Sequence, residues 1–325
     1  MKSSAFAGLC FALAALSNPA WADEQCPPLR VVASVDMITM PGGRVVVPMM
    51  IAGETHYLFL GTAVPYTSIT ASFAIAHKFP REHSNINFVD ITGEVYDKMA
   101  KVPSFGIGRL TTGTTRLLMV EHEFPAGNGI TPEGTLGADF LRAYDVELDF
   151  GASKLRLISR AHCDEEPVYW PSQTMAKLPM LVTDMNKITF KMTLDGHELQ
   201  TILNTSMPGS TLRLVTAKTV YDVDNSTPGN KEVGKMADGT PLFAHRFQSL
   251  TVDGLTIANP LLVLMPSKAD AEIEHLHAMH SGAGLGPIYI HQQPELTLGM
   301  AELRHLHVYI DYHHQMVYLT PADAH

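Results

Sequence analysis

The chain has 325 residues, and its 33 acidic and 23 basic side chains give a formal net charge of −10. No cluster of Lys and Arg stands out, so neither nucleic acid nor an anionic membrane surface is an expected partner. The length suits one large two-lobed unit or two domains of ordinary size.

The N-terminus has the pattern of a secretory signal. Lys2 precedes an apolar run over Ala5–Leu16, and the segment ends in Ala20-Trp21-Ala22. This pattern predicts a signal peptide over 1–22, cleaved near Ala22. The run is too short to span a bilayer as a helix. We therefore expect a periplasmic or secreted protein without a membrane span.

Cysteine usage agrees with export. Cys10 would leave with the signal, so Cys26 and Cys163 would remain. An even number of cysteines in an oxidising compartment favours a disulfide between these two residues. Two free thiols are the alternative.

Apolar runs bounded by turn residues predict a β-rich chain. The expected strands, in chain order, are Arg44–Ile51, Val146–Phe150, Thr189–Leu194 and Val308–Tyr312, with turns at Ala52-Gly53 and Asp195-Gly196. Short helix signals cover Thr70–Lys78, Asp139–Ala143, Ala269–Met279 and Ala301–His305. Prolines and acidic residues between 160 and 179 indicate a linker. We expect one lobe over 23–163, a linker over 164–180 and a second lobe over 181–325.

An internal repeat supports two related lobes. A shift of 162 places Leu136–Ile158 on Leu298–Thr320 without a gap, and seven of the 23 positions are identical. A shift of 143 places Val47–Ile69 on Phe190–Leu212. The shifts differ by 162 − 143 = 19 residues, so the second unit carries an insertion, expected at Pro266–Gly284.

Two loops of the repeat carry one motif. Leu60-Gly61-Thr62-Ala63-Val64-Pro65 and Leu203-Asn204-Thr205-Ser206-Met207-Pro208 each place Thr two residues after a Leu and Pro three residues further on. Downstream, Leu-Gly-x-x-x-Leu is followed by a strand that ends in Asp149-Phe150 or Asp311-Tyr312. This chain resembles the retropepsin-like and pepsin-like aspartyl proteases, in a bacterial form with two fused copies.

The resemblance implies an all-β, bilobal aspartic-protease-like β-barrel fold with a pseudo-two-fold repeat and a few short helices. It also implies one catalytic Asp in each motif loop, and these positions hold Gly61 and Asn204. The motif glycines become Ala63 and Ser206. Thr62 and Thr205 remain, and in the family such hydroxyls bond across the two-fold axis and tie the loops together. The expected cleft residues are Gly61, Thr62, Ala63, Tyr96, Asn204, Thr205 and Ser206.

The missing carboxylates remove the family's chemistry. Two close carboxylates share a proton, so that one activates a water and the other polarises the scissile carbonyl. Asp149, in Leu148-Asp149-Phe150-Gly151, looks like a better active site than either loop. However, the shift of 162 places it on Asp311, so we expect Asp149 to end a strand and cap a turn.

Phe88–Val102 lies where the first lobe's flap hairpin is expected, and residues 232–245 are its counterpart. Tyr96 is the candidate aromatic that packs on a bound peptide; an ordinary surface hairpin with a half-buried Tyr is the alternative. Asp90 and Glu94 are the carboxylates expected near the cleft mouth of this lobe.

Histidines are concentrated at the C-terminus. Nine of the sixteen lie in 275–325, and His275, His277 and His280 are weak candidates for a copper or zinc site. His305 and His307 would share a face of an extended strand, and a polar loop with solvated turns is the alternative.

Three functions follow from these observations. A pseudopeptidase whose interlobe cleft binds an extended peptide or a partner's chain is favoured, with no cofactor. The alternatives are an aspartic-type endopeptidase with displaced catalytic groups, and a periplasmic metal-binding protein that uses the His-rich C-terminal lobe.

Overall fold

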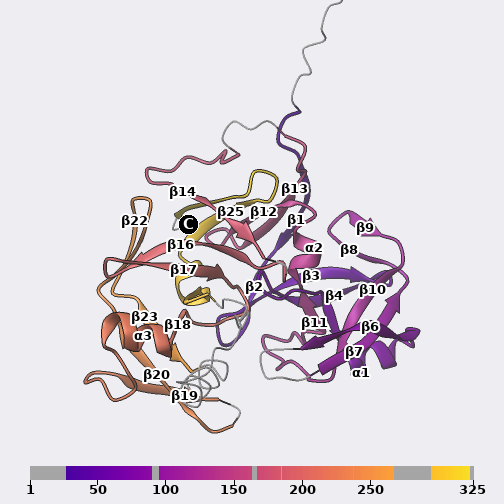
Figure 1. The fold of residues 1–325 in the computed structure, drawn as a ribbon. Coiled ribbons are helices and arrows are strands. Elements are labelled where there is room, and N and C mark those ends of the chain that lie inside the picture. Colours follow the sequence, from indigo (N-terminus) through magenta and orange to yellow (C-terminus); the bar gives the residue numbers. More distant parts are fainter. Residues whose placement is uncertain are drawn as a thin grey trace, which may run out of the picture.

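The computed structural model describes residues 27–89, 95–162, 167–183, 185–236, 238–266 and 294–322. These residues form three β-sheets with a few short helices. In Figure 1 two ten-stranded sheets lie to the right and left, and a six-stranded sheet joins them across the upper middle.

The first ten-stranded sheet lies within residues 38–136. Its strands are β2 (Ile38–Thr39), β3 (Val45–Ile51), β4 (Glu54–Leu60), β5 (Ser68–Thr70), β6 (Arg81–Val89), β7 (Val95–Val102), β8 (Phe105–Ile107), β9 (Leu110–Thr112), β10 (Thr115–Val120) and β11 (Gly134–Leu136). Their order is β6-β7-β10-β5-β11-β4-β3-β8-β9, with β2 paired to β3.

The second ten-stranded sheet repeats this order. Its strands are β15 (Leu181–Val182), β16 (Ile188–Leu194), β17 (His197–Leu203), β18 (Thr211–Arg213), β19 (Lys231–Lys235), β20 (Pro241–Arg246), β21 (Ser249–Val252), β22 (Leu255–Ala258), β23 (Leu261–Met265) and β24 (Leu296–Leu298). The order β19-β20-β23-β18-β24-β17-β16-β21-β22, with β15 paired to β16, matches the first sheet strand for strand.

The strand register follows the sequence repeat. Leu60 pairs with Leu136, and their equivalents Leu203 and Leu298 pair with each other. Both strand pairs are parallel, and the alternation of apolar residues alone does not specify this direction of pairing. The predicted two-fold repeat is therefore present in the hydrogen-bonding pattern.

The predicted insertion can also be placed from the register. Met50 pairs with Gly106, and the equivalent pair in the second sheet is Thr193 and Thr251, so the shift grows from 143 to 145. It is 162 at β24, where Leu298 is the equivalent of Leu136. Hence 162 − 145 = 17 of the extra residues enter between β23 and β24, the interval that contains Pro266–Gly284.

The six-stranded sheet contains strands from both halves. Its strands are β1 (Val31–Asp36), β12 (Asp145–Asp149), β13 (Lys154–Ile158), β14 (Ala176–Pro179), β25 (Leu306–Asp311) and β26 (Met316–Pro321), in the order β1-β13-β12-β25-β26-β14. Glu147 pairs with Tyr309, which is its own repeat equivalent at the shift of 162. The pseudo-two-fold axis therefore passes through this pair.

Strand β14 lies inside the segment 164–180 that was predicted to be a linker. Ala176 and Leu178 are buried and alternate with exposed Lys177 and Pro179. The strand is at the sheet edge, where a proline does not interrupt hydrogen bonding. The strand was not predicted because its alternation covers only four residues and lies among prolines, which usually indicate a loop.

The predicted hairpin turns are confirmed. Ala52 and Gly53 have φ values of 52° and 90°, and Asp195 and Gly196 have values of 44° and 86°. Positive φ at both central residues defines the turn that matches the twist of a two-residue hairpin. Ala52 adopts this conformation although its Cβ disfavours it.

The helices are α1 (Ala71–Ala76), α2 (Ala138–Leu141), α3 (Leu214–Tyr221) and α5 (Met300–Leu303). The Thr70 hydroxyl caps α1 by accepting a hydrogen bond from the Phe73 amide (3.2 Å). Helix α3 is the repeat equivalent of α1 and was not predicted. Its first residue follows Arg213, which makes no side-chain cap, so the usual start signal is absent. No helix among the described residues is long and apolar enough to cross a membrane.

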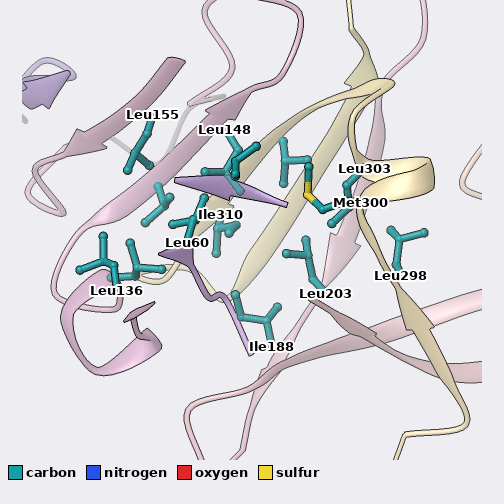
Figure 2. Close-up of a cluster of buried hydrophobic side chains, with 14 of the residues drawn as sticks. Leu60, Leu136, Leu148, Leu155, Ile188, Leu203, Leu298, Met300, Leu303 and Ile310 are labelled. Carbon is teal, nitrogen blue, oxygen red and sulfur yellow. The ribbon is translucent and has the colours of Figure 1, made fainter. Parts of the chain in front are cut away.

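One hydrophobic cluster extends through both halves of the chain. Figure 2 shows the part where the motif strands reach the six-stranded sheet. Its labelled side chains, each at most 2% exposed, are Leu60, Leu136, Leu148, Leu155, Ile188, Leu203, Leu298, Met300, Leu303 and Ile310. The two motif loops are therefore positioned by a shared core rather than by separate domains.

Several predictions lie outside the described residues. They are the signal peptide over 1–22, the Cys26–Cys163 disulfide, the helix over Ala269–Met279, the carboxylates Asp90 and Glu94, and the candidate metal ligands His275, His277 and His280.

Candidate functional site

The two motif loops have the same backbone path. The Gly61 amide donates to the Leu136 carbonyl (2.9 Å), and the equivalent Asn204 amide donates to Leu298 (3.0 Å). The first residues of α2 and α5 bind the other end of each loop. The Ala138 amide donates to the Val64 carbonyl (2.8 Å), and the Met300 amide donates to the Met207 carbonyl (2.9 Å). Each loop is thus held at both ends by its own lobe.

The two loops meet through Thr62 and Thr205. The Thr62 amide donates to the Thr205 hydroxyl (3.1 Å), and the Thr205 amide donates to the Thr62 hydroxyl (3.1 Å). Each hydroxyl in turn donates to a carbonyl of the other half, Thr62 to Leu203 (3.0 Å) and Thr205 to Leu60 (2.7 Å). Both residues are fully buried. This reciprocal contact is the one that the resemblance implies for the two threonines.

The Gly61 position has no room for a side chain. A Cβ added there would lie 2.7 Å from Cγ2 of Thr135 and 2.8 Å from Cγ2 of Val64. Real Cβ atoms do not approach other atoms so closely, and both neighbours are β-branched and stiff. The first motif loop is therefore closely packed around a residue without a side chain.

The Asn204 side chain bonds within its own loop. Its Oδ1 accepts a hydrogen bond from the Ser206 amide (2.9 Å), the local turn that Asn and Asp commonly form. The Ser206 hydroxyl is buried and makes no hydrogen bond. Ala63, the equivalent of Ser206 in the first loop, is 8% exposed.

Two carboxylates that sequence reasoning did not single out support the loops. Asp139 of α2 accepts hydrogen bonds from the Thr67 amide (2.8 Å) and hydroxyl (2.7 Å). In the other half the Ser210 hydroxyl donates to Glu302 of α5. Thr67 and Ser210 are repeat equivalents, but Asp139 and Glu302 are offset by one position. This offset removed the repeat signal that could have found them.

These two carboxyl groups are tuned mainly by burial. Burial raises the pKa of Asp139, and the hydrogen bonds from Thr67 oppose the increase. Burial also raises the pKa of Glu302, and the Ser210 hydroxyl opposes it. Both groups therefore resist ionisation more than free carboxyls do.

Asp149 ends a strand and caps a turn, as predicted. Its Oδ1 accepts a hydrogen bond from the Ala152 amide (2.8 Å), and its Oδ2 lies 3.5 Å from Nη1 of Arg156. It belongs to the six-stranded sheet and not to either motif loop.

Tyr96 lies in the predicted hairpin, in β7, but its side chain is only 5% exposed. It packs with Leu118 and Val120, and its hydroxyl is 3.2 Å from Nδ1 of His122. Alternation along β7 directs Tyr96 into its own lobe, so it does not present a free aromatic face to a ligand. Phe88 of β6 instead reaches the motif loop, where its ring lies 4.5 Å from that of Tyr66.

The described C-terminal histidines do not share one site. His305 precedes β25, so the condition for His305 and His307 to share one strand face, an extended stretch through both, is not met. His307 is buried against Trp170, with ring centroids 3.6 Å apart. His313 and His314 occupy the turn between β25 and β26.

No protein-family model matches the chain, and no curated protein matches it in sequence. Solved structures do resemble it. An aspartic proteinase from Irpex lacteus is 12% identical with a TM-score of 0.52, and the match covers 89% of this chain and 97% of that protein. Basic 7S globulin from soybean is 10% identical with a TM-score of 0.48, over 92% and 96%.

The chain therefore has the bilobal, all-β fold of pepsin-like aspartic proteinases. At 12% identity the likeness shows the fold and not the activity.

Proposed function

We propose that this chain is a non-catalytic, aspartyl-protease-like protein whose interlobe cleft binds an extended peptide or a segment of a partner protein. The observation that carries the proposal is the reciprocal contact of Thr62 and Thr205 beside two positions that lack a carboxylate. The frame of the site is kept and its titratable groups are absent.

The chemistry supports inactivity. The family's mechanism needs two carboxylates that share a proton. Gly61 has no side chain, and Asn204 cannot act as an acid or a base. Since a positioned acid or base typically contributes about 10²–10⁴-fold to a rate, losing both groups removes the basis of the reaction.

Displaced catalytic groups are the main alternative. Among the described residues, Asp139 and Glu302 are the carboxylates that hydrogen-bond to the motif segments, and both are engaged there with Thr67 and Ser210. Because both carboxylates hold the segments next to the motif loops, a structural role is favoured.

The hairpins that extend from both sheets favour peptide binding. β6 and β19 are edge strands of their sheets, and edge strands can accept an added strand. Val95 in β7 is 56% exposed and Val233 in β19 is 50% exposed. These valines supply apolar surface for a peptide, which we propose the protein meets after export.

The first experiment tests catalysis. The mature protein is incubated with a diverse peptide pool from acid to neutral pH, with and without chelator, and products are read by mass spectrometry. We expect no cleavage. Reproducible cleavage by the wild type would overturn the proposal, and its sensitivity to chelator would separate a metal from displaced carboxylates.

The second experiment tests binding. A photo-crosslinking residue is placed at Val95 or Val233, and in a matched control at Leu181, which is 66% exposed outside the two hairpins. We expect the peptide pool to crosslink at the hairpin positions and not at Leu181. Equal labelling at all three positions would reject a peptide-binding cleft even if the protein is inactive.

A further inference from the structure

A row of polar side chains lies on one face of the two central strands of the six-stranded sheet. Successive strand residues point to opposite faces, and Leu148 and Ile310 face the core (Figure 2). The opposite face carries Asp145, Glu147 and Asp149 of β12 and His307, Tyr309 and Asp311 of β25. Carboxylates buried in such a row need either a positive charge beside them or a bound proton.

One end of the row has a permanent cation. Arg156 pairs with Glu147 and lies 3.5 Å from Asp149. His307 adds a hydrogen bond to Glu147 (2.9 Å) and is covered by Trp170. The charges at this end are therefore matched by a guanidinium that stays protonated.

The other end has two carboxylates and two histidines. Oδ2 of Asp145 is 2.6 Å from Nε2 of His162, and Oδ2 of Asp311 is 2.8 Å from Nδ1 of His314. Ligand atoms of Asp145, His162 and Asp311 all lie within 4.8 Å of one another. Arg160 approaches this end, but its guanidinium donates to the Tyr312 carbonyl (3.1 Å).

Both carboxylates are fully buried, and the His162 side chain is 1% exposed. Burial raises the pKa of Asp145, the hydrogen bond from His162 opposes this, and the Asp311 carboxylate raises it again. Two positive charges would neutralise the pair. They can come from two imidazolium rings or from one divalent cation.

We propose that Asp145, His162, Asp311 and His314 bind one zinc ion. Two carboxylate oxygens and two imidazole nitrogens make a four-ligand set that zinc accepts, and the ion makes the site neutral with uncharged imidazoles. Metal–ligand distances of about 2.0–2.2 Å require the Asp145–His162 and Asp311–His314 contacts to lengthen slightly. The two pairs must also move closer to each other.

The backbone orients these ligands. Oδ1 of Asp145 accepts a hydrogen bond from the Tyr312 amide (2.8 Å), and Oδ1 of Asp311 accepts one from the His314 amide (2.7 Å). In both residues Oδ2 is left to face the histidines, as in metal sites whose second oxygen is held by the protein. His314 is 26% exposed and provides a route for the ion. The ion would tie residue 162 to strands from both lobes.

The test measures zinc on the full mature protein after chelator treatment and dialysis. Zinc is added and bound metal is quantified by mass spectrometry, with Co²⁺ absorption as a direct report on coordination. We expect about one ion per chain, weaker binding by at least 10-fold in His314→Gln, and loss in His162→Gln or Asp311→Asn. Circular dichroism identifies variants that fail to fold, and His314→Gln, at a partly exposed position, is designed to avoid that failure.

Two controls separate other candidates. One control changes His275, His277 and His280 to Asn, and the other changes His77 to Gln in the group Glu54, His56 and His77. Both variants should keep the ion. The proposal is overturned if wild type binds no zinc at micromolar concentration. It is also overturned if folded His314→Gln binds zinc as tightly as wild type, or if the triple variant alone loses it.

Discussion

Replacing Thr62 by Val tests whether the contact between the two loops stabilises the fold. Valine has nearly the same shape but lacks the hydroxyl, which donates to the Leu203 carbonyl (3.0 Å) and accepts from the Thr205 amide (3.1 Å). The variant leaves both backbone groups buried and unpaired. At roughly 1–3 kcal/mol for each group, the free energy of unfolding should fall by about 2–6 kcal/mol.

This loss is large because natural domains are stable by only about 5–15 kcal/mol. The assay is urea unfolding followed by circular dichroism. The two free energies are compared provided that both proteins show the same dependence of this energy on urea concentration. Thr62→Ser is the matched control, since it keeps the hydroxyl and loses only a methyl group. The reasoning is refuted if Thr62→Val lies within about 0.5 kcal/mol of wild type, or if the serine variant is equally destabilised.

Three further predictions concern single residues. Glu302→Gln removes a carboxyl whose pKa is raised by burial. The stability of wild type relative to this variant should therefore rise as pH falls from neutral through the folded-state pKa, and it should rise no further below the unfolded value near 4.5. Urea midpoints measured across pH test this difference. Ala52→Asn should raise the free energy of unfolding by about 0.5–1 kcal/mol, because Asn tolerates positive φ and favours this hairpin turn. Glu147→Gln should lower it by about 1–3 kcal/mol, because Arg156 and His307 lose a buried charged acceptor while Arg156 stays near Asp149.

Each of these has a contrary result. A Glu302→Gln difference that is constant between pH 7 and pH 4 would show that this carboxyl has the same pKa in both states. Ala52→Val serves as the opposite control, since a β-branched residue at φ 52° should destabilise the turn. A Glu147→Gln protein as stable as wild type would mean that Arg156 and His307 do not depend on this charge.

The sequence by itself determined the class of fold and the two-fold repeat. The shifts of 143 and 162 recur as strand registers, because apolar alternation and the hairpin turns after Ile51 and Leu194 define which residues can pair. The motif loops were found for the same reason, since Thr62 and Thr205 keep their spacing to the apolar strands before them.

The tertiary structure alone decided what surrounds those loops. Burial directs Tyr96 into its own lobe, and close packing fills the space where a side chain of residue 61 would lie. The cluster joins Asp145 and His162 of the first half to Asp311 and His314 of the second half, more than 140 residues away along the chain. The two halves of the cluster meet because β12 pairs with β25, and neither strand's own alternation of residues shows which strand will lie beside it.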